Sequence, residues 1–225
     1  MQPKNKMPKY KLVCFDVDGT LIDNIKFSWN VFHDYFKVDM ERRENARSDF
    51  FSGKISYLQW AWHDINMWKE KGAKKEDFLR AMDHLSLMNG AMETLQELKR
   101  NNLKLAIISG SMNILLEKFI PDYEEFFDDV FLSRIYFDED GFIKKIEPTE
   151  FDIEKKADAL KQIAKRERIR LEECVFVGDY LNDLKVMQEA GLGIAFNCRH
   201  DELRKAADVV IEKKDLREVL RYILN

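Results

Sequence analysis

The chain has 225 residues, 45% of them hydrophobic, and a formal net charge of −4. This composition supports a folded core and provides no basic field for nucleic acid, and no apolar run is long enough for a membrane span, so we expect neither partner. Three scattered cysteines, Cys14, Cys174 and Cys198, form no disulfide or zinc pattern and are expected to be free thiols. No signal peptide is recognisable, which makes the cytoplasm the expected location. Residues 1–8 are expected to form a loose tail.

Five short apolar segments are predicted to form buried strands, because they are rich in strand-forming residues and lack helical spacing. They lie at residues 11–15, 103–109, 173–178, 192–196 and 208–212. Apolar residues at helical spacing occupy 91–101 and 156–169. An Asp-Gly turn between two strand-like runs predicts a hairpin at 135–146. The alternation of strands and helices predicts an α/β fold with a Rossmann-like parallel sheet flanked by helices.

Residues 24–88 interrupt this alternation and contain no buried-strand pattern. Three sets of apolar residues at helical spacing occur there, beginning at Ile25, Tyr57 and Phe78. We therefore predict a core made of residues 9–23 and 89–225, with a small helical cap at 24–88. All four tryptophans lie in this cap. We expect them to build its interior, with one or two facing a ligand pocket.

Polar residues follow three of the predicted strands, where ligands bind in open parallel sheets. They are Asp16 and Asp18 after the first strand, Ser109 and Gly110 after the second, and Asp179, Asn182 and Asp183 after the third. If these strands are neighbours, four carboxylates converge and repel one another. A divalent cation removes the conflict, and oxygen ligands of this kind suit Mg²⁺, which commonly joins carboxylates to a phosphate.

The spacing of these residues is typical of phosphoryl transfer. Asp16 and Asp18 are two apart in an extended segment, so both side chains reach the same cavity. One carboxylate can attack phosphorus while the other protonates the leaving oxygen and then activates water. Ser109 and the backbone N–H groups after it can hold phosphoryl oxygens. Lys155 and Lys156, at the start of the next predicted helix, are candidates for the missing positive charge.

Four motifs occur in this order: "DVDGT", "IISGS", a lysine that opens a helix, and "GDYLND". In these motifs the chain resembles the phosphatases of the haloacid dehalogenase (HAD) superfamily, and within it the phosphoserine phosphatase group. The resemblance covers residues 10–23 and 89–225 and is poor in the predicted cap. It implies a HAD-like hydrolase core and an Mg²⁺-dependent phosphomonoester hydrolase. The enzyme would act through an aspartyl-phosphate on a small phosphorylated metabolite.

The resemblance also implies a role for each matching residue. Asp16 corresponds to the nucleophile and a metal ligand, and Asp18 to the acid/base, whose main-chain carbonyl also reaches the metal. The implied phosphate-binding residues are Ser109, Gly110, Lys156 and Asn182. The implied further metal residues are Asp179, which corresponds to a metal ligand, and Asp183, which corresponds to a residue that orients the metal's waters. Lys156 matches the motif lysine better than Lys155 does.

The predicted cap departs from the phosphoserine phosphatase pattern at two positions. Ile25 stands where that group has a glutamate for the serine ammonium, and Asp64 stands where it has an arginine for the serine carboxylate. An apolar residue and a carboxylate cannot make these contacts, so we expect weak activity on free phosphoserine. The arginines that could substitute are Arg42, Arg43 and Arg47, and the aromatic candidates for the pocket wall are Trp29, Trp60 and Trp62.

Other functions fit parts of the same pattern. A phosphotransferase or mutase would use the same aspartyl-phosphate, and a true phosphoserine phosphatase would need a shifted cap. A dehalogenase needs no acid at position 18, so Asp18 argues against it. A phospho-accepting scaffold without turnover would resemble a receiver module, which lacks the second aspartate. The sequence leaves the oligomeric state open.

Overall fold

The computed structural model describes residues 9–153 and 155–225, so the predicted tail at 1–8 lies outside the described residues. A seven-stranded sheet with the order β6-β5-β4-β1-β7-β8-β9 forms its centre. The strands are β1 (Leu12–Phe15), β4 (Lys104–Met112), β5 (Asp129–Phe137), β6 (Ile143–Glu147), β7 (Cys174–Gly178), β8 (Leu192–Phe196) and β9 (Val209–Ile211). All neighbours pair in parallel except β5 and β6, which form the predicted hairpin. The α/β prediction is confirmed.

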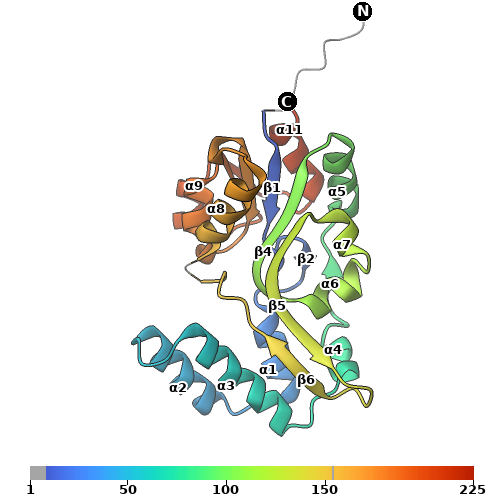
Figure 1. Cartoon of the computed structure of the whole chain (residues 1–225), viewed down its shortest axis with the longest axis vertical. Coiled ribbons are helices and arrows are strands. Elements are labelled where there is room, and N and C mark those ends of the chain that lie inside the picture. Colours follow the sequence, from blue (N-terminus) through green and yellow to red (C-terminus); the bar gives the residue numbers. More distant parts are fainter. Residues whose placement is uncertain (1–8, 154) are drawn as a thin grey trace, which may run out of the picture.

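Helices cover both faces of the sheet (Figure 1), with α8 and α9 on one face and α5, α6 and α7 on the other. The core helices are α5 (Ala91–Arg100), α6 (Asn113–Phe119), α7 (Tyr123–Phe126), α8 (Lys156–Glu167), α9 (Leu184–Glu189), α10 (Asp201–Ala206) and α11 (Leu220–Ile223). Three short 3₁₀ turns add η1 (Leu171–Glu173), η2 (Leu181–Asp183) and η3 (Leu216–Val219). Alternate side chains of β1 enter opposite cores, since Val13 and Phe15 join one apolar cluster and Leu12 and Cys14 the other. The central strand is therefore buried on both faces.

Residues 28–81, called the helical segment below, form α1 (Ser28–Phe36), α2 (Met40–Phe51), α3 (Tyr57–Glu70) and α4 (Lys75–Ala81). Figure 1 shows α1, α2 and α3 at the end of the molecule opposite the carboxyl terminus. Asp39 caps α2 by accepting from two backbone N–H groups, and Ser56 forms a capping box with Gln59 at α3. β2 (Ile22–Asp23) and β3 (Ser86–Leu87) pair in an antiparallel manner. The pair holds together the segment that leads into the helical segment and the segment that returns from it. No pattern in the sequence predicts these two-residue strands.

Aromatic rings hold the helical segment together. Trp68 is fully buried and makes edge-to-face contacts with Phe32 and Phe78, while its indole N–H donates to His33 Nδ1 at 3.1 Å. Two of the predicted helical patterns extend past the helices, because Ile25 precedes α1 and Leu85 follows α4. These residues still pack against the main core, which explains their apolar character.

The three cysteines are free and buried, as expected. Within residues 9–153 and 155–225, no helix is long and apolar enough to cross a membrane.

Candidate active site

Asp16 and Asp18 follow β1 directly and are both buried. The Asp16 N–H donates to the Val177 carbonyl at 3.0 Å, which extends the β1–β7 pairing by one residue and fixes its position. Gly19 completes the turn with a φ of +79°, and a Cβ there would overlap the Asp179 carboxylate. Glycine is therefore required at position 19, where the chain turns close to the Asp179 carboxylate.

The Asp18 carboxylate lies between the core and the helical segment. It accepts from the Ser28 N–H of α1 at 2.6 Å and from Ser111 Oγ of β4 at 2.8 Å. Burial, and then the neighbouring Asp16 carboxylate, raise the pKa of Asp18 to about 6. A carboxyl group with this pKa can hold or release a proton near neutral pH, as a general acid and base must.

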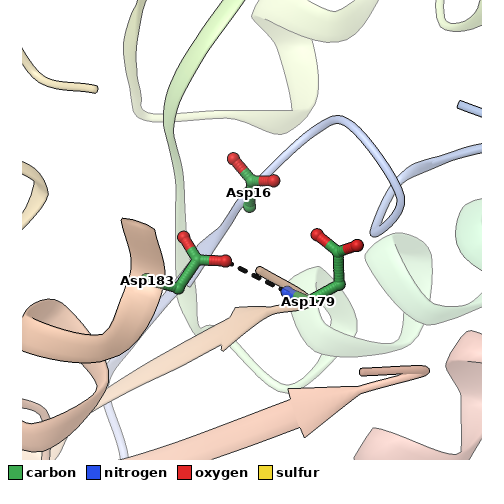
Figure 2. A group of neighbouring side chains, drawn as sticks. All are labelled: Asp16, Asp179 and Asp183. Carbon is green, nitrogen blue, oxygen red and sulfur yellow. Dashed lines mark hydrogen bonds between the residues drawn. The ribbon is translucent and has the colours of Figure 1, made fainter. Parts of the chain in front are cut away.

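One carboxylate oxygen from each of Asp16, Asp179 and Asp183 lies within 4.8 Å of the other two. Figure 2 shows the three side chains as neighbours, with Asp16 coming from the end of β1 and Asp179 and Asp183 from the segment after β7. Asp183 is oriented by the backbone N–H groups of Asp179 and Tyr180, at 3.0 and 3.1 Å. Burial and the nearby Asp16 carboxylate raise the pKa of both Asp179 and Asp183 above the ordinary aspartate range. The negative charge of the cluster is therefore only partly compensated.

Asp179 Oδ1 shows what this cluster is suited to bind. The atom is buried and has no hydrogen-bond partner among the described residues. An unpartnered carboxylate oxygen inside a group of three is the arrangement that a cation completes. Because the cluster offers only carboxylate oxygens, it fits a hard cation such as Mg²⁺ better than a thiolate- or imidazole-binding metal.

Lys156 begins α8 and is 1% exposed. Its Nζ donates to Asp16 Oδ1 and to Asp183 Oδ1, each at 2.7 Å. Burial alone would lower the pKa of Lys156, but the carboxylates of Asp16 and Asp183 outweigh burial and hold it above the ordinary lysine value. The ammonium is therefore retained at the cluster. Lys155, the other candidate, is half-exposed and donates to Glu150 instead.

The predicted phosphate-binding residues Ser109, Gly110 and Asn182 lie beside this cluster. Ser109 is buried within β4, which continues to Met112 and so runs past the predicted end at residue 109, and its Oγ accepts from the Ser111 N–H at 3.2 Å. The Gly110 carbonyl accepts from the Trp29 indole at 3.0 Å. Asn182 Nδ2 donates at 3.1 Å to Asp152, a residue with no predicted role. These contacts place Gly110 and Asn182 around Asp152, and the phosphate-binding roles of the three residues stay predictions.

Three residues that contact the site carried no prediction. Ser111 could have been found from its spacing, because it follows Ser109 by two residues on one strand and so faces the same side. Asp152 and Tyr57, which hydrogen-bond to each other at 2.9 Å, lie 95 positions apart in the chain. No local pattern links them.

A cavity of about 670 Å³ lies between the helical segment and the core. Its lining includes Trp29, Asn30, Arg43, Arg47, Tyr57, Trp60, Asp64, Asp152 and Asn182. The predictions for Trp29 and Trp60 as wall residues therefore agree with the structure. Trp62 is 43% exposed and is not part of the wall, so that expectation was wrong.

The structure also places the two positions that depart from the phosphoserine phosphatase pattern, Ile25 and Asp64, and the three candidate arginines. Ile25 packs against the core and does not line the cavity. Asp64 does line it, but its carboxylate accepts from His33 at 3.0 Å and lies 3.3 Å from His63. Of the three arginines, Arg43 and Arg47 line the cavity, whereas Arg42 pairs with Glu70 on the surface.

Comparisons with known proteins agree with this geometry. The phosphoserine phosphatase of Methanocaldococcus jannaschii is 32% identical over 220 residues, covering 96% of this chain and 98% of that protein. The phosphoserine phosphatase of Campylobacter jejuni subsp. doylei is 27% identical, with 95% and 99% covered. A solved phospho-aspartyl intermediate analogue of phosphoserine phosphatase has a TM-score of 0.72 at 31% identity, with 96% and 99% covered. The haloacid dehalogenase-like hydrolase family matches residues 10–191. The chain therefore belongs to the haloacid dehalogenase-like hydrolase family and is a phosphatase.

Proposed function

We propose that this enzyme is an Mg²⁺-dependent hydrolase of a small phosphate monoester, with the cytoplasm as its expected location. The observation that carries the proposal is the convergence of Asp16, Asp179 and Asp183 within 4.8 Å, beside a buried Asp18 whose pKa is raised to about 6. A nucleophile and a separate proton donor then stand at one strand edge. Both are needed to exchange an alcohol for water at phosphorus.

In the proposed mechanism, an oxygen of Asp16 attacks phosphorus and the bond to the leaving oxygen breaks. Asp18 gives its proton to that oxygen, so the leaving group departs as a neutral alcohol. Asp18 then removes a proton from water as the water attacks the aspartyl-phosphate, which regenerates Asp16 and releases phosphate. Ser109, Gly110, Lys156 and Asn182, called the phosphoryl site below, would hold the phosphoryl oxygens.

Magnesium would be held by Asp16, Asp179, Asp183 and the main-chain carbonyl of Asp18. When bound, it would offset the negative charge of the carboxylates and the phosphoryl group. Lys156 lies within hydrogen-bond distance of two of these carboxylates. It therefore supports the charge balance of the site from the α8 side.

We further propose that the leaving group carries an anionic oxygen and no adjacent ammonium. Two donors on the cavity wall, Arg43 Nε and Trp60 Nε1, are buried without a hydrogen-bond partner among the described residues, although Arg43 Nε lies 3.9 Å from the Asp64 carboxylate. The carboxylates of the wall already have donors, for example His33 on Asp64 and Tyr57 on Asp152. A ligand with an acceptor would satisfy Arg43 and Trp60, whereas an ammonium would compete for occupied carboxylates.

The second candidate is a phosphoserine phosphatase with a rearranged helical segment. It is favoured by the names of the relatives and by Arg43, which lies 3.9 Å from Asp64, the position aligned with the carboxylate-binding arginine. Arg43 could then hold the serine carboxylate from α2 instead of α3. On the described cavity wall, Asn182 Oδ1 is the one buried acceptor without a hydrogen-bond partner, and in this candidate it would accept from the serine ammonium.

Phosphate release from a panel of phosphorylated metabolites, measured with Mg²⁺ and with EDTA, tests the proposal. We expect Mg²⁺-dependent release that EDTA abolishes, with esters that carry a carboxylate but no ammonium preferred over phosphoserine. A leading rate on phosphoserine would favour the second candidate. Adding an acceptor alcohol separates hydrolysis from phosphotransfer, since a transferase would form a new ester. Undiminished turnover in EDTA would contradict the metal assignment.

A further inference from the structure

Asp152 lies in the segment that joins β6 to α8 and is partly buried beside the phosphoryl site. Its carboxylate accepts from Asn182 Nδ2 at 3.1 Å and from the Tyr57 hydroxyl at 2.9 Å. It also packs over Gly110 so closely that a Cβ on that residue would overlap its carboxyl group. The side chain thus covers one phosphoryl-site residue and uses a hydrogen-bond donor of another.

The position of Asp152 is unusual for a carboxylate. Burial raises its pKa, and the negative charge of Asp16 acts in the same direction, while the charge of Lys156 opposes both. No ion pair within 4.0 Å holds it among the described residues. Its carboxylate accepts from a side-chain amide and a phenol, and both types of donor can also bind phosphoryl oxygens. Asp152 therefore resembles a ligand of the phosphoryl site more than a structural ion pair.

We propose that Asp152 is a specificity-determining carboxylate that occupies the phosphoryl site in the unliganded enzyme and is displaced by the phosphoryl group of the substrate. The proposal rests on the proposed function, because that function assigns Gly110 and Asn182 to phosphate. A phosphoryl oxygen cannot lie over Gly110 while the Asp152 carboxyl group covers it. Each binding event must therefore move Asp152 away from Asn182.

Tyr57 connects this displacement to the helical segment. It belongs to α3 and lines the cavity, yet its hydroxyl hydrogen-bonds to a residue of the core. When Asp152 leaves, the Tyr57 hydroxyl loses its acceptor and becomes available to the leaving group. Displacement of Asp152 at the phosphoryl site thus frees the Tyr57 hydroxyl in the cavity. Binding of the phosphoryl group and binding of the leaving group are therefore coupled.

Binding of inorganic phosphate, measured by calorimetry in Mg²⁺ buffer, tests the proposal without requiring turnover. We expect phosphate to bind Asp152→Ala and Asp152→Asn about tenfold more tightly than wild type, because the site no longer has to be vacated. Tyr57→Phe removes no charge but loosens Asp152, and should tighten binding about threefold. Asp152→Asn keeps the side-chain shape in case the alanine variant fails to fold, and thermal melting checks each protein.

Glu150→Gln is the matched control. It removes one negative charge from the same segment, but Glu150 is exposed and pairs with Lys155. Its phosphate affinity should equal that of wild type. Equal tightening in Glu150→Gln would overturn the proposal in favour of a general charge effect. Unchanged or weaker binding in the folded Asp152 variants would also overturn it, as would an unaltered affinity in Tyr57→Phe.

The same measurements keep this proposal apart from the proposed function. If no phosphate monoester is hydrolysed but the Asp152 variants bind phosphate more tightly, the result supports the displacement of Asp152 and contradicts the proposed hydrolysis. If turnover is normal while the affinities do not change, the reaction stands and the displacement fails. An absence of phosphate binding in every variant would overturn the displacement.

Discussion

The core lines the cavity with Asn182, a neighbour of the carboxylate cluster, and the helical segment lines it with Arg43 and Trp60, but the two regions hold their functional groups differently. At the strand edge the carboxylates are fixed by backbone: Asp16 continues the pairing of β1 with β7, and Asp183 accepts from two consecutive N–H groups. In the helical segment, Arg43 and Trp60 extend from helices and keep unpartnered donors. Chemistry is therefore tied to the sheet, whereas recognition depends on side chains that can change without disturbing a strand.

The largest expected effect tests the strand-edge side of this comparison. Asp16→Asn keeps the size of the side chain but removes the nucleophile and one oxygen ligand of the carboxylate cluster. We expect kcat to fall by about 10⁵-fold or more, with an unchanged circular dichroism spectrum. Phosphate release from p-nitrophenyl phosphate is the assay. Substantial Mg²⁺-dependent turnover by the folded variant would show that another group attacks phosphorus.

The next effect separates Asp18 from Asp16. Asp18→Asn removes the proton donor but leaves the attacking carboxylate, so the loss should be about 10²- to 10⁴-fold. Alkyl phosphates should lose more than p-nitrophenyl phosphate, because nitrophenolate departs with little help from a proton. Parallel kcat measurements on both substrates provide the check. Equal losses on the two would assign Asp18 a role other than proton transfer.

Arg43 tests the recognition side. Arg43→Gln removes the guanidinium whose Nε is unpartnered on the cavity wall. For a carboxylate-bearing phosphate ester, we expect kcat/KM to fall about 10- to 100-fold, in line with a charged hydrogen bond. For p-nitrophenyl phosphate, which lacks the carboxylate, kcat/KM should change little.

Arg42→Gln is the control for this variant. Arg42 neighbours Arg43 on α2 but pairs with Glu70 on the surface, a type of contact worth about 0–1 kcal/mol. It should leave both substrates unaffected. If Arg43→Gln lowers activity equally on both substrates, Arg43 supports the fold of the helical segment instead of reading the leaving group.

The smallest effect is expected at Trp62. This tryptophan is 43% exposed and lies outside the cavity wall, although it neighbours wall residues in sequence. Trp62→Ala should change kcat/KM by less than about twofold and stability by about 0.5 kcal/mol or less, as for other surface substitutions. Steady-state kinetics and thermal unfolding measure the two quantities. A large loss of activity would mean that the outer face of α3 contacts the substrate.

The sequence predicted the strand edge better than the helical segment, for a physical reason. Buried parallel strands are continuous apolar runs, and their carboxyl ends lie at one edge of the sheet. Asp16, Ser109 and Asp179 could therefore be assigned to the same edge from the sequence alone. The fold class and the resemblance to HAD phosphatases are confirmed by the sheet and the comparisons. The domain limits at 23/24 and 88/89 and the residue roles stay predictions.

The helical segment was harder to predict, because helical spacing shows which residues share one face of a helix but not what that face packs against. Trp29, Trp60 and Trp62 were equivalent candidates, yet only the first two of them line the cavity. Ile25 faces the core because it lies ahead of α1 in the crossing from β2. Asp152 escaped notice because its partners are set by tertiary packing.

The antiparallel pair of β2 and β3 has a consequence for how such an enzyme can diversify. Asp23 and Ser86 are register partners, so the chain leaves for the helical segment and returns from it at adjacent points. A segment of another length or sequence, spliced between those two residues, would need to close only a short gap. The registers of β1 with β4 and β7 would be preserved, because neither crossing passes through the large sheet. Recombination at this junction could therefore exchange one recognition module for another while the hydrolytic machinery is inherited intact.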